Sequence, residues 1–211
     1  MNELPNYFLA DLPPDANFSA TLITEACQTL KRNRARYLAD RPTSALIRVL
    51  HRVGESWLDD EFPFRRIALA RGPEETGFSQ ATIAAGLGAF FRQLNGENLE
   101  ALLTQDLGHP QRLDTVVGSL TETRAQRMAT ANGPEFLVHI AAGNLPIPAM
   151  MSLVLGLLTR SAQFVKCARG TSFLPRLFAH SIYDSEPKLG ACFELAEWRG
   201  RKKLLVAFST W

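Results

Sequence analysis

The stretch that decides the fold is "HIAAGNLPIPAMMSLVLGLLTRSAQFVKCA", residues 139–168. It starts inside an apolar run of strand length, passes through a Gly-Asn-Leu-Pro turn into an apolar helical segment, and ends in a second apolar run. Two buried strands joined by a crossover helix form a βαβ unit, which requires a parallel sheet. Asn144 and Lys166 lie where the two expected strands end, so they are the first candidate functional residues.

Apolar runs of strand length and helical segments continue to alternate along the rest of the chain. The expected strands are Glu135 to Ile140, Ala162 to Cys167 and Ala191 to Trp198, and the expected helices are Pro146 to Thr159 and Ser172 to Asp184. This order predicts a βαβαβ unit, which is half of a doubly wound nucleotide-binding fold. Ligands of such sheets bind at the carboxyl ends of the strands, where Asn144 and Lys166 fall.

The first two thirds of the chain carry apolar residues at helical spacing. Four stripes are visible: Leu22, Ile23, Ala26, Cys27 and Leu30; Leu46, Val49, Leu50, Val53 and Trp57; Ile83, Leu87, Phe90, Phe91 and Leu94; Leu99, Leu102, Leu103 and Leu107. Such stripes are typical of core helix faces rather than of cofactor sites. We therefore expect an α/β protein with a mainly helical region over residues 1–130 and the first half of a dinucleotide-binding domain over residues 131–200.

The charge balance and the cysteines limit the classes of partner. Because 23 basic and 21 acidic residues leave a formal charge of +2, neither a nucleic acid nor an anionic membrane surface is expected as a partner. The three cysteines lack metal-type spacing, which favours neither a zinc site nor a disulfide framework and fits a reducing cytoplasm.

No secretory signal and no membrane span are expected. The first thirty residues lack the basic start and apolar run of a secretory signal. The longest apolar run, residues 136–158, contains His139, Asn144, Pro146 and Pro148, and a strand, turn and helix explain it without burying polar groups in lipid.

Each candidate residue has a functional and a structural interpretation. Gly143 lets the chain turn after the first strand, and the Asn144 amide could then stabilise an oxyanion; alternatively, Asn144 caps a helix whose first residue is Pro146. Lys166 could reach the ribose hydroxyls or a phosphate of a nucleotide, or it could simply be solvated. The Gly-x-Gly-x-x-Gly fingerprint is missing after the first strand, which disfavours a standard Rossmann dehydrogenase.

The segment "VHIAAGNLPIPAMMSLVLGLLTRSAQFVKCARGTSFLPRLFAHSIYDSEPKLGACFELAEWRG" resembles the acyl-CoA reductase family typified by LuxC, the reductase of the bacterial luminescence fatty acid reductase complex. That family is a branch of the aldehyde dehydrogenase superfamily. The upstream motifs "WLDDEFPFRRIAL", "ETGFS" and "LLTQDLGHPQRLD" fall in the expected order, so the resemblance runs from about residue 20 to residue 200.

The resemblance implies an aldehyde dehydrogenase-like fold and an enzyme that reduces a fatty acyl thioester, on coenzyme A or on a protein, to a fatty aldehyde with NADPH. Asn144 matches the superfamily's oxyanion asparagine, and Lys166 matches its ribose-binding lysine. A glutamate shortly after that lysine favours NAD in the wider superfamily, whereas this chain has Arg169 there. An arginine without a nearby acid tolerates a 2′-phosphate, which favours NADP; alternatively, Arg169 is a solvent-facing loop residue.

The family's route needs a cysteine nucleophile, which the resemblance places in a catalytic domain beyond residue 211. We expect Cys27, Cys167 and Cys192 to be buried structural thiols, with Cys167 pointing away from Lys166 and Cys192 inside the third strand. His139 and His180 are expected to be structural because no acid or nucleophile lies at a suggestive spacing.

Residues 201–211, "RKKLLVAFSTW", depart from the family pattern and suggest a frameshifted or prematurely ended tail. We therefore expect the amino-terminal portion of a reductase with an incomplete cofactor sheet. The alternative is a non-catalytic fragment or an interaction module for an acyl-transfer partner. The family also implies an acyl-protein synthetase and a transferase as partners, and a homo-oligomer in its full-length members.

With only three strands, we expect the first strand to lie at an open sheet edge that favours association. We also expect the Leu153, Leu157 and Leu158 side of the crossover helix to lose part of its cover.

Overall fold

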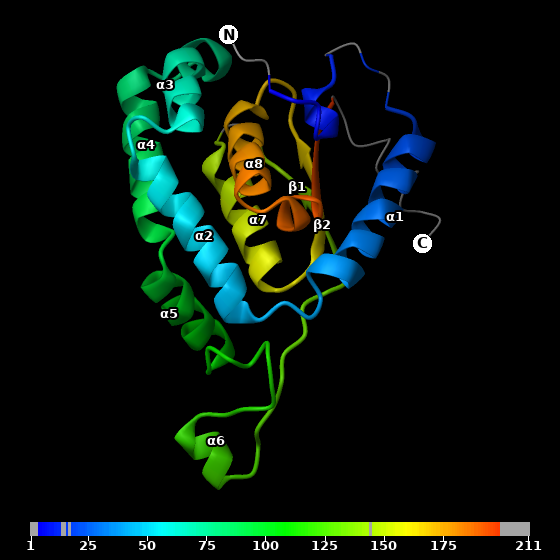
Figure 1. Cartoon of the computed structure of the whole chain (residues 1–211), viewed down its shortest axis with the longest axis vertical. Helices are drawn as coiled ribbons and strands as arrows, with labels where there is room; N and C mark the ends of the chain where they lie inside the picture. Colours follow the sequence, from blue (N-terminus) through cyan, green and yellow to red (C-terminus); the bar gives the residue numbers. More distant parts are fainter. Residues whose placement is uncertain (1–3, 14–15, 17, 144, 199–211) are drawn as a thin grey trace.

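The computed structural model describes residues 4–13, 16, 18–143 and 145–198, and Figure 1 shows helices arranged around a small sheet. The described part of the chain is an α/β structure, as predicted. Its helices are η1 (Leu9–Asp11), α1 (Ala20–Tyr37), α2 (Thr43–Leu58), α3 (Pro63–Thr76), α4 (Gln80–Gln93), α5 (Gly96–Leu107), α6 (Leu120–Arg124), α7 (Ile147–Leu158), α8 (Phe173–Ser185) and α9 (Pro187–Gly190). Its strands are β1 (Phe136–Ile140), β2 (Ala162–Cys167) and β3 (Phe193–Glu197).

The three strands are parallel and lie in the order β1-β2-β3. Val138 of β1 is in register with Phe164 of β2, which is in register with Glu194 of β3. The predicted βαβαβ order is therefore confirmed. The third strand is shorter than expected, because α9 and a turn precede it, and Cys192 lies in that turn rather than in the strand.

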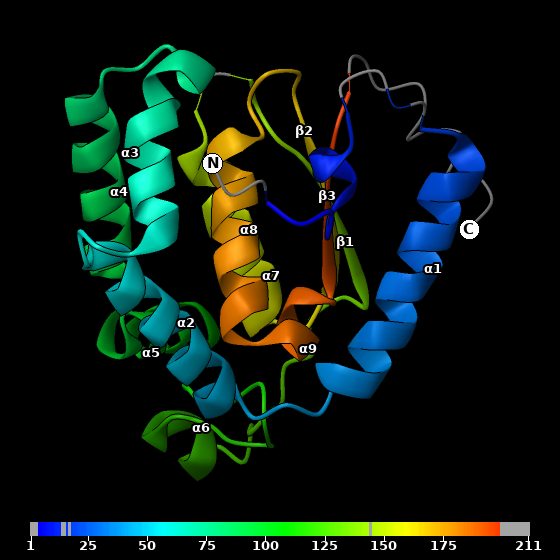
Figure 2. The same ribbon diagram turned by 45° about the horizontal axis from the view of Figure 1, so that its top comes forward.

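Helices cover both faces of the sheet, and Figure 2 shows the resulting layers. On one face, Val165 and Cys167 of β2 join the core formed with α7 and α8, and α2, α4 and α5 pack outside these two helices. On the other face, Phe164 packs with the α1 residues Ile23 and Cys27. Since side chains alternate along a strand, Lys166 lies on the α1 face, opposite Cys167, as predicted.

The four predicted helical stripes are confirmed as α1, α2, α4 and α5, whereas α3 was not predicted. Its only buried residues among those described are Ala68 and Gly72, so it has no apolar stripe to detect. Gly72 gives α3 its close packing, because a Cβ there would lie 2.6 Å from Cδ1 of Ile83 in α4. Pro63 starts the helix and Gly77, with a φ of 75°, ends it.

A buried arginine fixes the turn that leads into β2. Arg160 is 8% exposed and has a φ of 57°. Its Nε donates to the carbonyl of Arg41 at 2.6 Å and its Nη2 donates to Oγ1 of Thr43 at 2.9 Å. The same guanidinium also contacts the carbonyl of Leu113 and the carboxylate of Asp114. The amino end of β2 is thereby tied to two segments that are distant in sequence, residues 41–43 and residues 113–114.

The expectation that α7 would lose cover over Leu153, Leu157 and Leu158 is wrong. All three side chains are at most 1% exposed, because they face the core that contains α2 and α8. The apolar residue that α7 exposes is Leu155, at 40%. The exposed side of α7 is therefore the side that carries Leu155.

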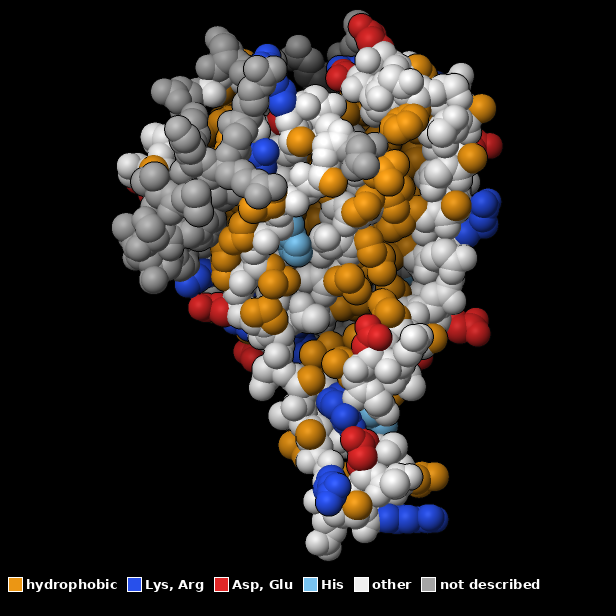
Figure 3. Space-filling view, turned by 180° about the vertical axis from the view of Figure 1, so that it is seen from behind, with side chains coloured by type: hydrophobic (Ala, Val, Ile, Leu, Met, Phe, Trp, Pro, Cys, Tyr) orange, Lys and Arg blue, Asp and Glu red, His pale blue; other side chains and the backbone are white. Residues whose placement is uncertain are grey.

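Strand β1 lies at the edge of the sheet, as predicted. The Ala141 N–H and the Glu135 carbonyl bond to β2, so the backbone groups of Val138 and Ile140 face away from it. The side chains of Val138 and Ile140 are 39% and 51% exposed. Figure 3, seen from behind, shows hydrophobic side chains gathered on this side of the molecule. An exposed apolar edge strand favours pairing with another chain.

We expect the protein to self-associate through β1 and Val138→Lys to shift it toward the monomer, because a charge at a strand edge opposes pairing. Light scattering coupled to gel filtration measures the shift. Val116→Lys is the matched control, since Val116 is 57% exposed but lies outside the sheet. Equal association of wild type and both variants would show that β1 is not the contact.

Candidate functional site

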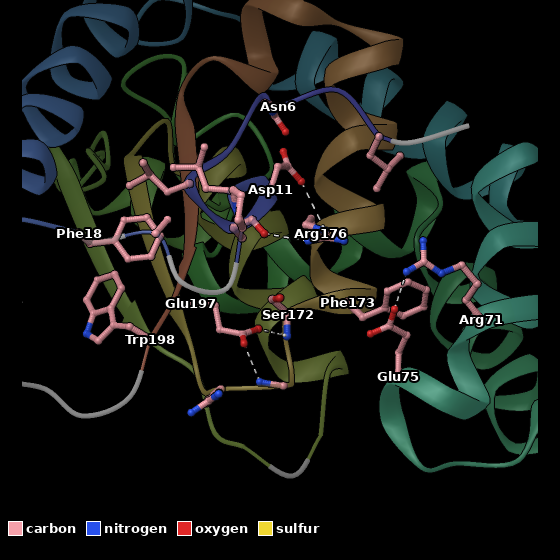
Figure 4. A pocket seen from close by; sticks show the side chains of 18 residues that line it. Asn6, Asp11, Phe18, Arg71, Glu75, Ser172, Phe173, Arg176, Glu197 and Trp198 are labelled. Carbon is pink, nitrogen blue, oxygen red and sulfur yellow. Dashed lines mark hydrogen bonds and ion pairs between the residues drawn. The ribbon is translucent and has the colours of Figure 1, made fainter. Parts of the chain in front are cut away.

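A cleft of about 940 Å³ lies at the carboxyl ends of β2 and β3. Its walls are the amino-terminal segment, the loop between β2 and α8, the end of β3, and parts of α3 and α8 (Figure 4). Six charged side chains line it: Asp11, Arg71, Glu75, Arg169, Arg176 and Glu197. The position agrees with the general rule that ligands of parallel α/β sheets bind beyond the carboxyl ends of the strands.

Ion pairs occupy two of the three arginines in the cleft. Arg71 Nη2 lies 2.6 Å from Oε1 of Glu75 in the next turn of α3. Arg176 Nε lies 3.4 Å from Oδ1 of Asp11. Within the described part of the chain, Arg169 makes no ion pair and is exposed, so it is the cleft arginine whose charge is left for a ligand.

Glu197, at the end of β3, binds the loop between β2 and α8 through its carboxylate. Glu197 accepts hydrogen bonds from the N–H of Gly170 through Oε1 at 2.7 Å and from the N–H of Ser172 through Oε2 at 3.2 Å. Glu197 therefore brings a carboxylate to the backbone of the residue that follows Arg169. The acid is absent from the loop sequence, and the parallel sheet brings it from the neighbouring strand.

The amino-terminal segment is held against α8 by a buried contact between His180 and Asp11. Nε2 of His180 lies 3.0 Å from both carboxylate oxygens of Asp11, and each side chain is 2% exposed. Arg176 adds a hydrogen bond from Nη1 to the carbonyl of Ala10 at 2.8 Å. His180 is structural, as predicted, but its acidic partner comes from 169 residues away and could not be found from spacing.

Glu194 of β3 holds the same segment. Its Oε1 accepts from the N–H of Leu9 at 2.7 Å and from the N–H of Leu195 at 2.9 Å. Although the residue as a whole is only partly buried, desolvation of its carboxyl group, assisted by the charge of Asp11, raises the pKa of Glu194 to about 8. The two backbone hydrogen bonds act in the opposite direction but are weaker.

The structure treats the three predicted site residues differently. Arg169 lines the cleft, whereas Lys166 is buried at 6% exposure near the end of β2 and is not among the lining residues. Asn144 lies outside the described residues. Its neighbour Gly143 packs closely on the β2–α8 loop, because a Cβ there would lie 3.2 Å from Cβ of Ala168. The loop after β1 and the loop after β2 therefore meet at the carboxyl end of the sheet.

The expectation that Pro146 is the first helical residue is wrong, because the helix begins at Ile147. Pro146 caps α7, and its carbonyl accepts the N–H of Met150 at 3.3 Å. Pro148 occupies the first turn, where a missing N–H costs nothing.

The three cysteines are buried thiols, as predicted. Burial is the main cause that raises the pKa of Cys27, Cys167 and Cys192 to about 12 each. Since the thiolate is the reactive form, none of them is suited to act as a nucleophile near neutral pH.

The cleft combines apolar and charged residues. Its volume of about 940 Å³ is within the range of small-molecule sites, and Phe18, Phe173 and Trp198 line it together with Arg169. Among the described residues, no group of three or more His, Cys, Asp or Glu side chains is arranged to hold a metal ion. In the same part of the chain, every helix is too short or too polar to cross a membrane.

The fold and the cleft together define an α/β protein with a ligand site at the strand ends. Residues 38–203 match the family model of acyl-CoA reductase (LuxC). Since the match covers most of the 211 residues, the chain belongs to the acyl-CoA reductase (LuxC) family. The family acts on acyl thioesters and is of a reductase class that commonly uses a nicotinamide cofactor. A comparison with curated proteins finds no match.

The raised pKa of Glu194 makes a pH dependence of stability testable. Because the folded pKa of about 8 lies above the ordinary 4.5, the contribution of this group to stability is full below about pH 4.5 and is lost as the pH rises toward about 8. Glu194→Gln keeps an acceptor for Leu9 without the charge, so its free energy of unfolding should fall less over this range, by on the order of a few kcal/mol.

Urea unfolding followed by tryptophan fluorescence at several pH values measures this difference. Glu25→Gln, at an exposed position of α1, is the control and should follow the wild type. The assignment is wrong if Glu194→Gln loses as much stability with rising pH as the wild type does.

Proposed function

We propose that this chain carries the NADPH-binding part of a reductase that converts a fatty acyl thioester, on coenzyme A or on a protein, into a fatty aldehyde. The observation that carries the proposal is the cleft at the carboxyl ends of β2 and β3, lined by Arg169, which makes no ion pair with any residue that the structure describes, in a chain of the acyl-CoA reductase family. A family of this kind needs a site for its reductant, and the cleft has the position, size and charge for one.

The proposed fold is that of the aldehyde dehydrogenase superfamily. Residues 131–200 would form the first half of its dinucleotide-binding domain, following a mainly helical region over residues 1–130. The parallel order β1-β2-β3 and the two crossover helices α7 and α8 support this assignment.

Each proposed site residue has a distinct role. Lys166 holds the ribose hydroxyls, and Arg169 attracts the 2′-phosphate that distinguishes NADPH. The reduced nicotinamide supplies the hydride for the thioester carbonyl. Asn144 donates its side-chain N–H to the carbonyl oxygen as negative charge develops there, an interaction typically worth about 3 kcal/mol or more.

A cysteine thioester intermediate is part of the proposal, and its nucleophile is none of the three cysteines of this chain. Their burial and their raised pKa values argue against acyl transfer to any of them. The same observation favours the second candidate function, a module that binds a cofactor or an acyl-transfer partner without chemistry of its own. We also propose a cytoplasmic location, an acyl-protein synthetase and a transferase as partners, and a homo-oligomeric state.

Titration of NADPH against the protein, followed by cofactor fluorescence, tests the proposed site. Lys166→Ala should weaken NADPH binding by about 1 to 3 kcal/mol, the range for a hydrogen bond to a charged group. Arg169→Ala, at an exposed position, tests the cleft itself, because Arg169 lines it and can be replaced without disturbing the core. Lys188→Ala, at an exposed position of α9, removes an equal charge outside the cleft and should leave the affinity unchanged.

Two results would contradict the proposal. Failure of the wild-type protein to bind NADPH would remove the cofactor site altogether. Unchanged affinity in a folded Lys166→Ala variant would remove Lys166 from that site.

A further inference from the structure

A carboxylate already binds the loop that carries Arg169, the residue proposed to attract the 2′-phosphate on the cofactor ribose. Glu197 accepts from the N–H of Gly170 at 2.7 Å and from the N–H of Ser172 at 3.2 Å, using both of its oxygens. The residue is only partly buried and lines the cleft (Figure 4). Since these contacts concern the ribose end of the cofactor, the inference drawn from them rests on the proposed function.

The two N–H groups that Glu197 occupies could otherwise donate to a phosphate bound at this loop. They stand at the amino end of α8, where the helix dipole and the backbone N–H groups favour an anion. Arg169 directly precedes Gly170 and lines the same cleft. A 2′-phosphate would therefore meet an attractive guanidinium and a competing carboxylate on one loop.

We propose that Glu197 is a specificity-determining residue, whose carboxylate competes with the 2′-phosphate of NADPH for the N–H groups of Gly170 and Ser172. The 2′-hydroxyl of NADH is a donor and can bond to that carboxylate, so NADH needs no such displacement. Arg169 and Glu197 then act in opposite directions: the arginine raises the preference for NADPH and the glutamate lowers it.

A merely structural role for Glu197 makes a different prediction. If its hydrogen bonds only support the loop, their loss should disturb the ribose site for both cofactors alike. If it competes with the phosphate, its loss should change the ratio of the two affinities. The ratio of the dissociation constants for NADH and NADPH is therefore the quantity to measure.

The experiment titrates NADPH and NADH separately against the wild type and Glu197→Gln, with calorimetry as the readout. Glutamine has nearly the same shape but no charge, and its single amide oxygen can accept from only one of the two N–H groups, so NADPH should bind about tenfold more tightly or better, while the affinity for NADH stays within about twofold or weakens. Arg169→Ala should move the ratio in the opposite direction. Glu75→Gln, which removes a carboxylate from the α3 wall of the same cleft, should leave the ratio unchanged.

An unchanged ratio in Glu197→Gln, or equal weakening of both cofactors, would overturn the inference. If that variant does not fold, Glu197→Asp serves instead, because a side chain shorter by one methylene withdraws the charge from the loop and should raise the relative affinity for NADPH. Wild-type protein that binds neither cofactor would overturn the proposed function and the inference with it. If the wild-type protein binds both cofactors and the ratio of their dissociation constants does not depend on residue 197, only the inference is overturned.

Discussion

The complete burial of β2 is the constraint on which the rest of the structure depends. All six of its residues are buried, so both faces of the central strand must be covered. The crossover helices α7 and α8 cover one face and α1 covers the other. Arg160 fixes the amino end of the strand to the α1–α2 connection. The cleft lies at the opposite, carboxyl end of this strand.

The cleft depends in turn on a segment that is distant in sequence. Residues around η1 form one wall, and Asp11, Leu9 and Ala10 are held by His180, Glu194 and Arg176 of α8 and β3. The wall is therefore attached to the same two elements whose ends carry the ligand-binding loop. A substitution of Glu194 or His180 would therefore disturb this wall of the cleft as well as the stability of the protein.

Local sequence patterns were sufficient for the sheet and for most helices, because β2 is mainly apolar, with Gln163 and Lys166 as its polar residues, and the stripes of α1, α2, α4 and α5 are regular. They failed for α3, whose buried face consists of Ala68 and Gly72 and therefore has no hydrophobic period. They also failed for the carboxylate bound to the β2–α8 loop, since Glu197 is 27 positions after Gly170 in the sequence and reaches the loop only through the parallel pairing of β2 with β3. Contacts between distant segments leave no spacing signal in a single sequence.

The central claim is that a nicotinamide nucleotide binds at the carboxyl ends of β2 and β3. Amide hydrogen exchange of the whole chain, measured with and without NADPH, tests it most directly because it locates the ligand without requiring turnover. The account predicts slower exchange in the loop of residues 168–172 and in residues 4–13, and little change in residues 113–133. Protection confined to residues 113–133, or no protection anywhere, would contradict it.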